Sequence, residues 1–377
     1  MKAEHFDTIV VGVGGMGSAA VYHLARRGER VLGLEQFDIP HDMGSSHGVT
    51  RVIRLTYFEH PSYVPLLARA YALWRELEQA GDEQLLYITG SIDAGAPDSF
   101  VVEGSMKSCE EHELAHEVLT SAELTGRFPG FNLPPEMMAV WQPDGGYLLP
   151  ERCIVHHVLQ AQALGGEVRA REAVVDWKAD QGSVTVRTTR TTYTAKRLIF
   201  TAGAWSQSLL ARLGQNAVPE RQVMGWFQPA QPELFHRERF PVFNCLVPEG
   251  HYYGFPMHGI PGFKIGKYHH LLQQTAPDDV DRECHPEDEE ALRACTQNYL
   301  TGGMGATLAL KMCMFTNTPD GHFIMDHHPE YANVVIAAGF SGHGFKFCSV
   351  VGEIVAEMAL DGESRHDIGM FGLGRFV

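Results

Sequence analysis

The segment that most restricts the fold is HFDTIVVGVGGMGSAAVYHLARRGERVLGLEQFD, which covers residues 5 to 38. Its β-branched run at Thr8–Val11 predicts a buried parallel strand, and the glycines at 12, 14 and 17 follow with the spacing GxGxxG. Helical spacing from 19 to 27 predicts a helix, and Val31–Leu34 predicts a second buried strand that ends at Glu35. A glycine loop between a strand and a helix, with an acid after the next strand, indicates a Rossmann-like fold that binds a dinucleotide.

The residues of this loop each have a physical reason for their position. Gly12 permits the tight turn, Gly14 allows a pyrophosphate to approach the backbone, and Gly17 allows helix and strand to pack closely. The free N–H groups and the positive dipole end of the helix then face the phosphates. Glu35 can accept hydrogen bonds from ribose hydroxyls, and its charge disfavours the 2′-phosphate of NADP, so FAD and NAD both remain open.

The charge of the chain excludes several classes of partner. A net charge of −16 over 377 residues argues against nucleic acid and against an anionic membrane surface, because both require an excess of Lys and Arg. No uninterrupted apolar run is long enough to span a bilayer, and the N-terminus MKAEHFDTIVVG lacks the pattern of a signal peptide. We therefore expect a cytoplasmic protein in which most of the seven cysteines are reduced and buried.

A second glycine-rich strand, loop and helix lie at the other end of the chain. Val334–Ala338 predicts a buried strand, Gly339, Gly342 and Gly344 form a loop, and a helix is expected from about residue 345 to 360. A helix N-terminus again faces a potential anion, which suits the negative charge that a reduced flavin carries at one edge of its ring. We expect this segment to fold back onto the first glycine loop.

Two other interpretations of the C-terminal segment are weaker. GFSGH resembles the nucleophile elbow GxSxG, but His343 stands where the second glycine is needed. The acids and histidines between residues 320 and 328 show no recognised ligand spacing, so we interpret them as turn residues and expect no metal site.

The candidate binding groups outside the glycine loops each have an ordinary alternative. Arg51 and Arg54 lie among apolar residues after the Gly/Ser-rich loop 44–48. A guanidinium that packs on apolar surface there could bind a carboxylate or phosphate through two parallel hydrogen bonds. The alternative is a pair of surface arginines. Lys264 in GFKIG is interpreted as an edge-strand lysine, with a buried cation over the cofactor as the alternative. Cys313 in LKMCMFTN, taken alone, is interpreted as a small buried apolar residue.

The rest of the sequence divides into an α/β nucleotide-binding domain and a second, sheet-based α+β domain that is inserted in two segments. In the first, Val174 can pack on an adenine, and the strand Leu198–Thr201 ends in small residues around Gly203 that allow a cofactor to approach. The second domain lacks glycine loops, and its strands show alternating apolar residues. We expect it to cover the cofactor. The boundaries are 1–84, 146–220 and 318–377 for the nucleotide-binding domain, and 85–145 and 221–317 for the sheet-based domain.

Taken together, five segments resemble the monomeric sarcosine oxidase and N-methyltryptophan oxidase family of amine-oxidising flavoproteins. The resemblance covers nearly the whole chain, and the last two segments are far more specific than a glycine loop. The segments are GVGGMG (12–17), GSSHGVTRVIR (44–54), YYGFP (252–256) with the lysine strand after it, CMFTNTPDGHFIMD (313–326) and NVVIAAGFSGHGFKF (333–347).

This resemblance implies FAD as the cofactor, attached through a thioether between Cys313 and the 8α carbon of the flavin. It also implies a monomeric enzyme that oxidises a small amino acid with O₂. The cofactor-binding positions expected from the resemblance and from the glycine loops are Cys313, Gly12, Gly14, Gly15, Gly17, Glu35, Ser45, Val174, Gly203, Gly342, His343, Gly344 and Lys346.

The substrate and catalytic positions follow from the same resemblance. It implies that Arg54 and Lys346 grip the substrate carboxylate, and that Tyr253 lines the pocket. It also implies that Lys264 lies over the flavin and activates oxygen, because a fixed positive charge stabilises nascent superoxide. Two further catalytic positions, on the substrate and flavin side, are Thr50 and Arg51.

Three positions depart from the family pattern. The active-site histidine is expected four residues after the lysine, where Tyr268 stands; one inserted residue would restore the register through His269, which we favour, with His270 as the alternative. Phe315 replaces a tyrosine, so a hydroxyl is missing from the pocket. Asn244 stands where oxidases of small substrates tend to have an apolar residue, so we expect a pocket of different polarity or size.

The expected activity is flavin-dependent oxidative demethylation of sarcosine or a related secondary amino acid. It consumes O₂ and water and gives glycine, formaldehyde and hydrogen peroxide when sarcosine is the substrate. The alternatives are an oxidase of another secondary amine, such as N-methyltryptophan, pipecolate or proline, and a flavin amine dehydrogenase that passes electrons to a partner. No nucleic-acid or membrane partner is expected.

Overall fold

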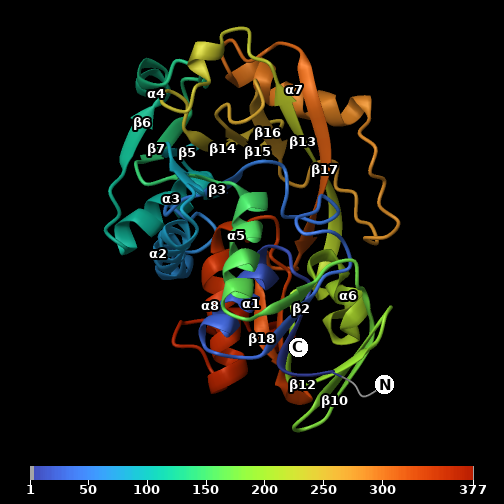
Figure 1. Ribbon diagram of the computed structural model, residues 1–377. Coiled ribbons are helices and arrows are strands. Elements are labelled where there is room, and N and C mark those ends of the chain that lie inside the picture. The colour runs from blue at the N-terminus through green and yellow to red at the C-terminus, as the bar shows by residue number, and fades with distance from the viewer. Residues whose placement is uncertain (1–3, 377) are drawn as a thin grey trace.

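The computed structural model describes residues 4–376, apart from the side chains of residues 211 and 212. Two large sheets organise the chain, one in the lower half of Figure 1 and one in the upper half. A third, small sheet contains β3 (Arg51–Ile53), β8 (Gly146–Leu148) and β4 (Leu86–Ile88). No helix in this described part of the chain has the length and apolar character needed to cross a membrane.

The first large sheet follows the predicted Rossmann-like plan. β1 (Glu4–Val11) pairs in parallel with β2 (Val31–Leu34) and β12 (Thr192–Phe200), and β12 pairs in parallel with β19 (Tyr331–Ala338). The first and last segments of the chain therefore lie in one sheet, as the two glycine loops predicted. The other strands of this sheet are β9 (Glu167–Arg169), β10 (Val174–Ala179), β11 (Val184–Thr188) and β18 (Ile324–His328).

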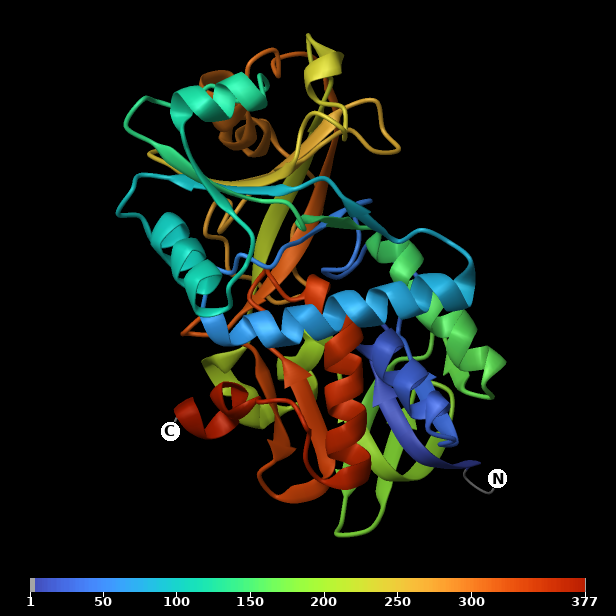
Figure 2. The same cartoon turned by 90° about the vertical axis from the view of Figure 1, so that its left-hand side faces the viewer.

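Helices cover one face of this sheet. α1 (Gly15–Arg26) packs against α5 (Pro150–Ala163) and α8 (Cys348–Asp361), and alternate strand residues such as Val10 and Val335 point into their shared core. Figure 2 shows α2 (Val64–Gly81) lying across this layer, between the two large sheets. On the opposite face, β10 and β11 of the same sheet and the short α6 (Ser206–Leu209) contribute side chains to a second apolar cluster. The predicted C-terminal helix begins later than expected, because residues 345–347 form a 3₁₀ turn before α8.

The second large sheet has the strand order β17–β13–β16–β15–β14–β5–β7–β6. β16 lies between β13 and β15, and Lys264 on it is 1% exposed, so the interpretation of Lys264 as an edge-strand lysine is wrong. The strands are β5 (Ser91–Gly95), β6 (Glu117–Thr120), β7 (Met138–Gln142), β13 (Val218–Phe227), β14 (Val242–Val247), β15 (Gly250–Phe255), β16 (Phe263–Lys267) and β17 (Thr307–Asn317). The helices beside this sheet are α3 (Phe100–Glu111), α4 (Ser121–Arg127) and α7 (Pro286–Tyr299).

Candidate active site

The first glycine loop has the geometry that a dinucleotide requires. Gly12 has a φ of +90°, and a Cβ atom there would lie 2.6 Å from the carbonyl oxygen of Thr201. A Cβ atom on Gly17 would lie 1.8 Å from the carbonyl oxygen of Gly12, so neither position admits a side chain. A Cβ atom on Gly14 would meet nothing within 4 Å, and this residue lines the neighbouring cavity. The backbone at Gly14 is therefore open to a ligand.

Glu35 is fixed at the end of β2, next to this loop. One carboxylate oxygen accepts a hydrogen bond from the backbone N–H of Val13 at 2.9 Å, and the other accepts one from the backbone N–H of Phe37 at 3.0 Å. The residue is only 5% exposed but lines the cavity. A carboxylate held in this way can receive ribose hydroxyls.

A cavity of about 390 Å³ is lined by residues from both the N-terminal and the C-terminal segments of the chain. Its walls contain the first glycine loop, the second glycine loop and the strand that carries Phe315, whose ring packs on Gly342. The structure thus brings together segments that are more than 300 residues apart in the sequence. The predicted cofactor positions that line the cavity are Gly12, Gly14, Gly15, Glu35, Ser45, Val174, Gly203, Gly342 and Gly344.

A buried histidine beside this cavity has polar atoms without protein partners. His47 lies between the cavity-lining Ser46 and Arg51, is 2% exposed, and has no hydrogen-bond partner at either ring nitrogen among the described residues. Burial, followed by the charge of Arg51, lowers the pKa of His47 to about 3, so the neutral ring offers one donor and one acceptor. Together with the glycine loop and the N-terminus of α1, these groups fit a flavin dinucleotide.

The second large sheet presents a polar face to this region and an apolar face to its own core. Phe243, Tyr252 and Ile265 are buried in the apolar cluster of the sheet, and side chains alternate along a strand. Their strand neighbours, including Asn244 and Tyr253, therefore lie on the other face. Residues that share this face by register are Asp93, Asn244, Tyr253, Lys264, Gly266, Gln222, Cys313 and Phe315.

Cys313 lies on this face beside Arg51. Its sulfur is 3.6 Å from Nη2 of Arg51 and 3.6 Å from the carbonyl oxygen of Ser45. Arg51 is held in place because it donates hydrogen bonds to the carbonyl oxygens of Ser45 at 2.7 Å and Thr50 at 2.9 Å. The guanidinium of Arg51 and the sulfur of Cys313 are therefore held next to one another on this face.

Lys264 is a buried amine above the same loop. Its Nζ donates hydrogen bonds to the carbonyl oxygens of Gly48 at 2.8 Å and Thr50 at 2.6 Å, and it lies 3.4 Å from the hydroxyl of Thr50. The Nζ atom also lies 4.4 Å from the ring centre of Phe255. Burial, followed by the charge of Arg51, lowers the pKa of Lys264 well below its usual value. The charge of this amine therefore responds strongly to any charge that forms beside it.

Arg54 is a fully buried guanidinium held by two carboxylates. It donates to both carboxylate oxygens of Glu59, at 3.0 and 2.8 Å, and to the carbonyl oxygen of Thr56, while Nη1 lies 3.9 Å from a carboxylate oxygen of Asp93. Its Cζ atom lies 4.5 Å from the ring centre of Tyr57. Burial opposes the shift, but the charge of Glu59, followed by that of Asp93, raises the pKa of Arg54.

Lys346 is a second buried cation near the ring of Tyr57. Its Nζ is 5.2 Å from the ring centre of Tyr57 and donates a hydrogen bond to the carbonyl oxygen of His343 at 2.7 Å. Burial, followed by the charge of Arg54, lowers the pKa of Lys346 to about 7. The ring of His343 lies 2.5 Å from the hydroxyl of Tyr57, and burial lowers the pKa of His343 to about 4. Arg54 and Lys346 are thus two cations that face one tyrosine ring.

The three candidates for the active-site histidine position occupy different places. The ring of Tyr268 lies 5.1 Å from that of Tyr253 and 5.9 Å from that of Phe315. The side chain of His269 is 55% exposed, and its Nδ1 lies 3.1 Å from a carboxylate oxygen of Glu220, which raises the pKa of His269. His270 is buried against Asp288, at 3.0 Å. The structure therefore brings Tyr268, and not His269 or His270, to the wall that Tyr253 and Phe315 form.

Sequence reasoning missed three polar residues of this site. Glu59 and Asp93 were not predicted as partners of Arg54, and His47 was not predicted as a cavity neighbour. An acid five positions after a candidate binding arginine was one available signal for Glu59. The acid in the strand-like SIDAG was a weaker signal for Asp93, because the sequence does not show which strand lies next to it.

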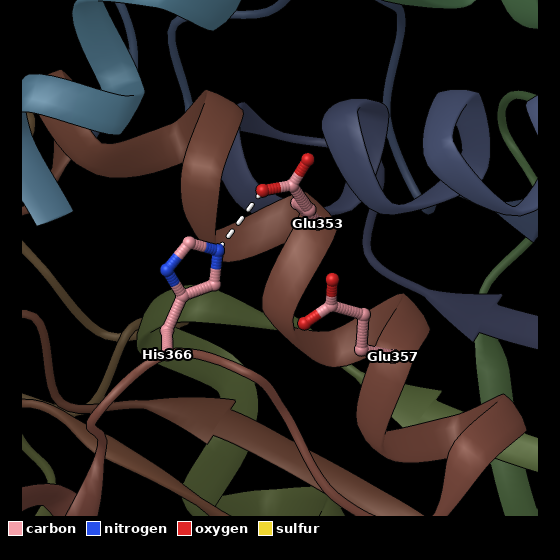
Figure 3. Close-up of side chains that lie close together, drawn as sticks. All are labelled: Glu353, Glu357 and His366. Atoms are coloured by element: carbon pink, nitrogen blue, oxygen red, sulfur yellow. Dashed lines mark hydrogen bonds and ion pairs between the residues drawn. The ribbon is translucent and has the colours of Figure 1, made fainter.

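A group of possible metal ligands lies away from this site, on α8 and the segment after it. Figure 3 shows Glu353, Glu357 and His366 close together. Arg69 donates to both oxygens of Glu353 at 2.9 and 2.7 Å, and Arg365 lies 2.8 Å from Glu353 and 3.1 Å from Glu357. Burial opposes the shift, but hydrogen bonds from Arg69, His366 and Arg365 lower the pKa of Glu353. Two guanidiniums already neutralise these acids, so the group is an ion-pair network that ties α2 to the C-terminal segment.

Comparisons with known proteins agree with this geometry. Residues 7–358 match the model of a family described as "FAD dependent oxidoreductase". The chain is 43% identical over 379 residues to "Monomeric sarcosine oxidase" of Bacillus sp. (strain B-0618), covering 99% of this chain and 97% of that protein. It is 34% identical to human "Peroxisomal sarcosine oxidase", covering 100% and 97%, and 34% identical to "N-methyl-L-tryptophan oxidase" of Yersinia pestis (strain Pestoides F), covering 98% and 99%.

Solved structures show the same fold. The open form of a Tyr258Phe mutant of NikD, described as "an unusual amino acid oxidase essential for nikkomycin biosynthesis", superposes with a TM-score of 0.86 over 98% of this chain and 97% of that one. Its sequence identity is 24%, so this comparison supports the fold alone. A glycine oxidase from Geobacillus kaustophilus gives a TM-score of 0.80 at 20% identity, with both chains fully covered.

Proposed function

Because the chain belongs to the family of FAD dependent oxidoreductases, we propose that it is an amine oxidase that demethylates sarcosine or a closely related secondary amino acid. The observation that carries the proposal is the pair of buried cations, Arg54 and Lys346, which lie 4.5 and 5.2 Å from the ring centre of Tyr57. Two cations in one buried site suit the carboxylate of an amino acid. The relatives named sarcosine oxidase are the reason for proposing a secondary amine as the substrate.

Residues around the cavity would hold FAD along its length. The N-terminus of α1 and the open backbone at Gly14 receive the pyrophosphate, Glu35 accepts the ribose hydroxyls, and Val174 packs on the adenine. The loop at Gly342–Gly344 would lie beside the flavin ring, because both of these glycines line the cavity. When bound, the flavin supplies an acceptor for the two electrons of the C–H bond next to the amine nitrogen.

Cys313 is the proposed point of covalent attachment. Two observations support it: the sulfur lies 3.6 Å from the carbonyl oxygen of Ser45 and 3.6 Å from Nη2 of Arg51, and both of these residues line the cavity. A thioether there would replace the S–H bond of Cys313 and a C–H bond of the 8α methyl group, and the two electrons and two protons released would pass through the flavin to O₂. The bond would fix the flavin ring against β17.

The substrate carboxylate would bind between Arg54 and Lys346. In the structure Arg54 already donates to Glu59, so an incoming carboxylate competes for a guanidinium that is occupied. Lys346 donates to a carbonyl oxygen and can turn its other N–H groups toward the ligand. The two cations also disfavour a protonated amine close by, because like charges repel, and the uncharged amine is the form that can be oxidised.

The wall opposite these cations would be aromatic. Tyr253, Tyr268 and Phe315 pack together and exclude water from the reacting carbon. We assign contact with the substrate to Tyr268, because the ring of His269 faces Glu220 and is 55% exposed. His269→Ala is therefore expected to change kcat/KM less than Tyr268→Ala does, and a larger loss in the His269 variant would contradict the assignment.

Lys264 is the proposed group for oxygen activation, with Thr50 and Arg51 beside it. Its amine is anchored by the carbonyl oxygens of Gly48 and Thr50. Negative charge that develops on oxygen raises the pKa of such a buried amine, so the ammonium form is present when it is needed. We also propose that the enzyme is monomeric and cytoplasmic.

The test is a panel of secondary amino acids assayed for substrate-dependent hydrogen peroxide with purified, yellow enzyme. The panel contains sarcosine, N-methyltryptophan, pipecolate and proline, with glycine as the unmethylated control. Sarcosine is expected to give peroxide and formaldehyde in equal amounts. Absence of peroxide with every amine, while the flavin remains bound, would overturn the proposal. Reduction of an artificial acceptor without peroxide in air would instead indicate the amine dehydrogenase.

A further inference from the structure

A buried glutamate lines the cavity beside Glu35. Glu172 is 2% exposed, and its backbone N–H donates a hydrogen bond to the carbonyl oxygen of Glu35 at 2.8 Å. One carboxylate oxygen of Glu172, Oε1, accepts hydrogen bonds from the hydroxyls of Thr188 at 2.7 Å and Tyr193 at 2.8 Å. The other oxygen, Oε2, has no hydrogen-bond partner among the residues that the structure describes, and these residues do not fully enclose it. Because Glu172 lines the cavity, Oε2 is the oxygen that is open to a ligand.

The hydroxyl groups behind Glu172 fix the orientation of its carboxylate. The hydroxyl oxygen of Tyr193 accepts a hydrogen bond from Nη1 of Arg169 at 2.6 Å, so the hydroxyl proton of Tyr193 points to Glu172. A carboxylate can only accept hydrogen bonds, so Tyr193 and Thr188 hold Oε1 from one side and leave Oε2 to the cavity. Glu172 therefore presents one fixed acceptor to whatever fills this part of the cavity.

The order of the parallel strands places Glu172 beyond the position of the ribose. β1, β2 and β9 are neighbours in the sheet, and neighbouring strands lie about 4.8 Å apart. The first glycine loop follows β1, Glu35 follows β2, and Glu172 comes shortly after β9. A nucleotide with its pyrophosphate on the loop and its ribose on Glu35 would therefore bring its base to the end of β9. Val174, the residue proposed to pack on the adenine, is two positions after Glu172 and also lines the cavity.

We infer that Oε2 of Glu172 accepts a hydrogen bond from the exocyclic amino group of the adenine and thereby selects an adenine dinucleotide. In FAD this amino group is the only N–H donor of the adenine, because the ring nitrogens are acceptors or carry the ribose. A ribose hydroxyl is the other donor near this end of the nucleotide, and the experiment below separates the two. The inference rests on the placement of FAD in the proposed function, but it does not depend on which amine is oxidised.

The physical basis is the cost of leaving a buried carboxylate oxygen without a donor. A bound nucleotide displaces water from Oε2, and the amino group of adenine replaces that water with an N–H donor. A base that lacks the amino group covers the same oxygen and supplies no hydrogen bond, which leaves a buried charge without a partner. Hydrogen bonds to charged groups are the stronger ones, so we expect the base without the amino group to bind about tenfold or more weakly.

The experiment titrates the full-length apoprotein with FAD and with its purine analogue, in which a hydrogen atom replaces the amino group of the adenine. Cys313→Ser is the parent for this comparison, because flavin that is not held by a thioether can be removed and added back. Calorimetry is expected to give a Kd for FAD that is about tenfold or more below that of the analogue. Glu172→Gln in the same background is expected to remove the preference, because the hydroxyls of Thr188 and Tyr193 retain the amide oxygen and an NH₂ group then faces the cavity.

A second acid-to-amide substitution is the matched control. Asp176→Asn changes an acid on β10 whose side chain is 49% exposed and pairs with Arg187 at 3.7 Å, and this variant is expected to keep the preference. Equal Kd values for FAD and the analogue in the parent would overturn the inference, and this comparison requires no folded Glu172 variant. An equal loss of affinity for both ligands in Glu172→Gln would also overturn it, because both ligands share the ribose hydroxyls.

The outcomes also distinguish this inference from the proposed function. If the apoprotein binds FAD and the analogue equally well, the proposed FAD site stands and only the role of Glu172 fails. If the apoprotein does not bind FAD, the proposed placement of the cofactor fails together with the inference. Peroxide formation by the holoenzyme with secondary amino acids tests the proposed activity separately from either result.

Discussion

Replacing Glu59 by glutamine separates two effects of the carboxylate that holds Arg54. Burial opposes ionisation of Glu59, but the charge of Arg54 lowers its pKa from 4.5 to about 2. This difference corresponds to roughly 3 kcal/mol of stability at pH 7. Because the folded-state pKa is the lower one, the stabilisation is complete above pH 4.5 and is lost as the pH falls through about 2. Glu59→Gln is therefore expected to destabilise the protein by about 3 kcal/mol at pH 7 and by about 1 kcal/mol at pH 3.

The same substitution is expected to strengthen carboxylate binding. In the proposed site Glu59 would compete with the substrate for the N–H groups of Arg54, so its neutral replacement is expected to tighten propionate binding about tenfold. The assays are denaturant unfolding at the two pH values and titration of flavin absorbance with propionate. Glu76→Gln is the control, because Glu76 pairs with Arg26 and Arg69 at a surface position that is 40% exposed. If Glu59→Gln destabilises the enzyme no more than Glu76→Gln does, the account of Arg54 is wrong.

Three further variants test the rest of the site. Cys313→Ser is expected to lose its yellow colour on acid precipitation, whereas the parent keeps it; colour that stays with the variant protein contradicts the thioether. Lys264→Met is expected to slow peroxide formation in air about 100-fold with little effect on anaerobic flavin bleaching, and fast reoxidation would contradict the role of Lys264. Propionate affinity is expected to fall as the pH rises through about 7, where Lys346 loses its proton, and Lys346→Met should remove that step; a pH profile that survives the substitution assigns it to another group.

The nucleotide-binding part of the fold could be predicted because its signals are local. The strand, loop and helix around Gly12 follow one another within about thirty residues, and each position has a direct steric or electrostatic reason. The return of the last segment to the sheet that contains β1 also followed, since both glycine loops had to reach one ligand. The start of the last helix was placed too early, because the sequence does not show that residues 345–347 form a 3₁₀ turn.

Most of the side-chain contacts of the sheet-based domain could not be predicted from the sequence. Lys264 was interpreted as an edge lysine because a strand alone does not reveal its neighbours, and only the strand order buries it. The contact between Asp93 and Asn244 joins residues 151 positions apart, and no local pattern predicts such a pair. The prediction that His269 fills the active-site histidine position depended on an assumed one-residue insertion. In the structure, the backbone N–H of Tyr268 donates a hydrogen bond to the carbonyl oxygen of His251, which continues the strand pairing to Tyr268.

The departures from the family pattern share one place in the structure. Tyr268, Phe315 and Asn244 all lie on the polar face of the second sheet, around Tyr253. The groups proposed for flavin attachment, oxygen activation and carboxylate binding are present together in the same region. Electron transfer depends on the flavin and these charges, whereas the choice of amine depends on the shape and polarity of the wall. In the proposed site, the substitutions would therefore bear on which secondary amino acid is oxidised, and the chemistry of oxidation would depend on the groups around Cys313.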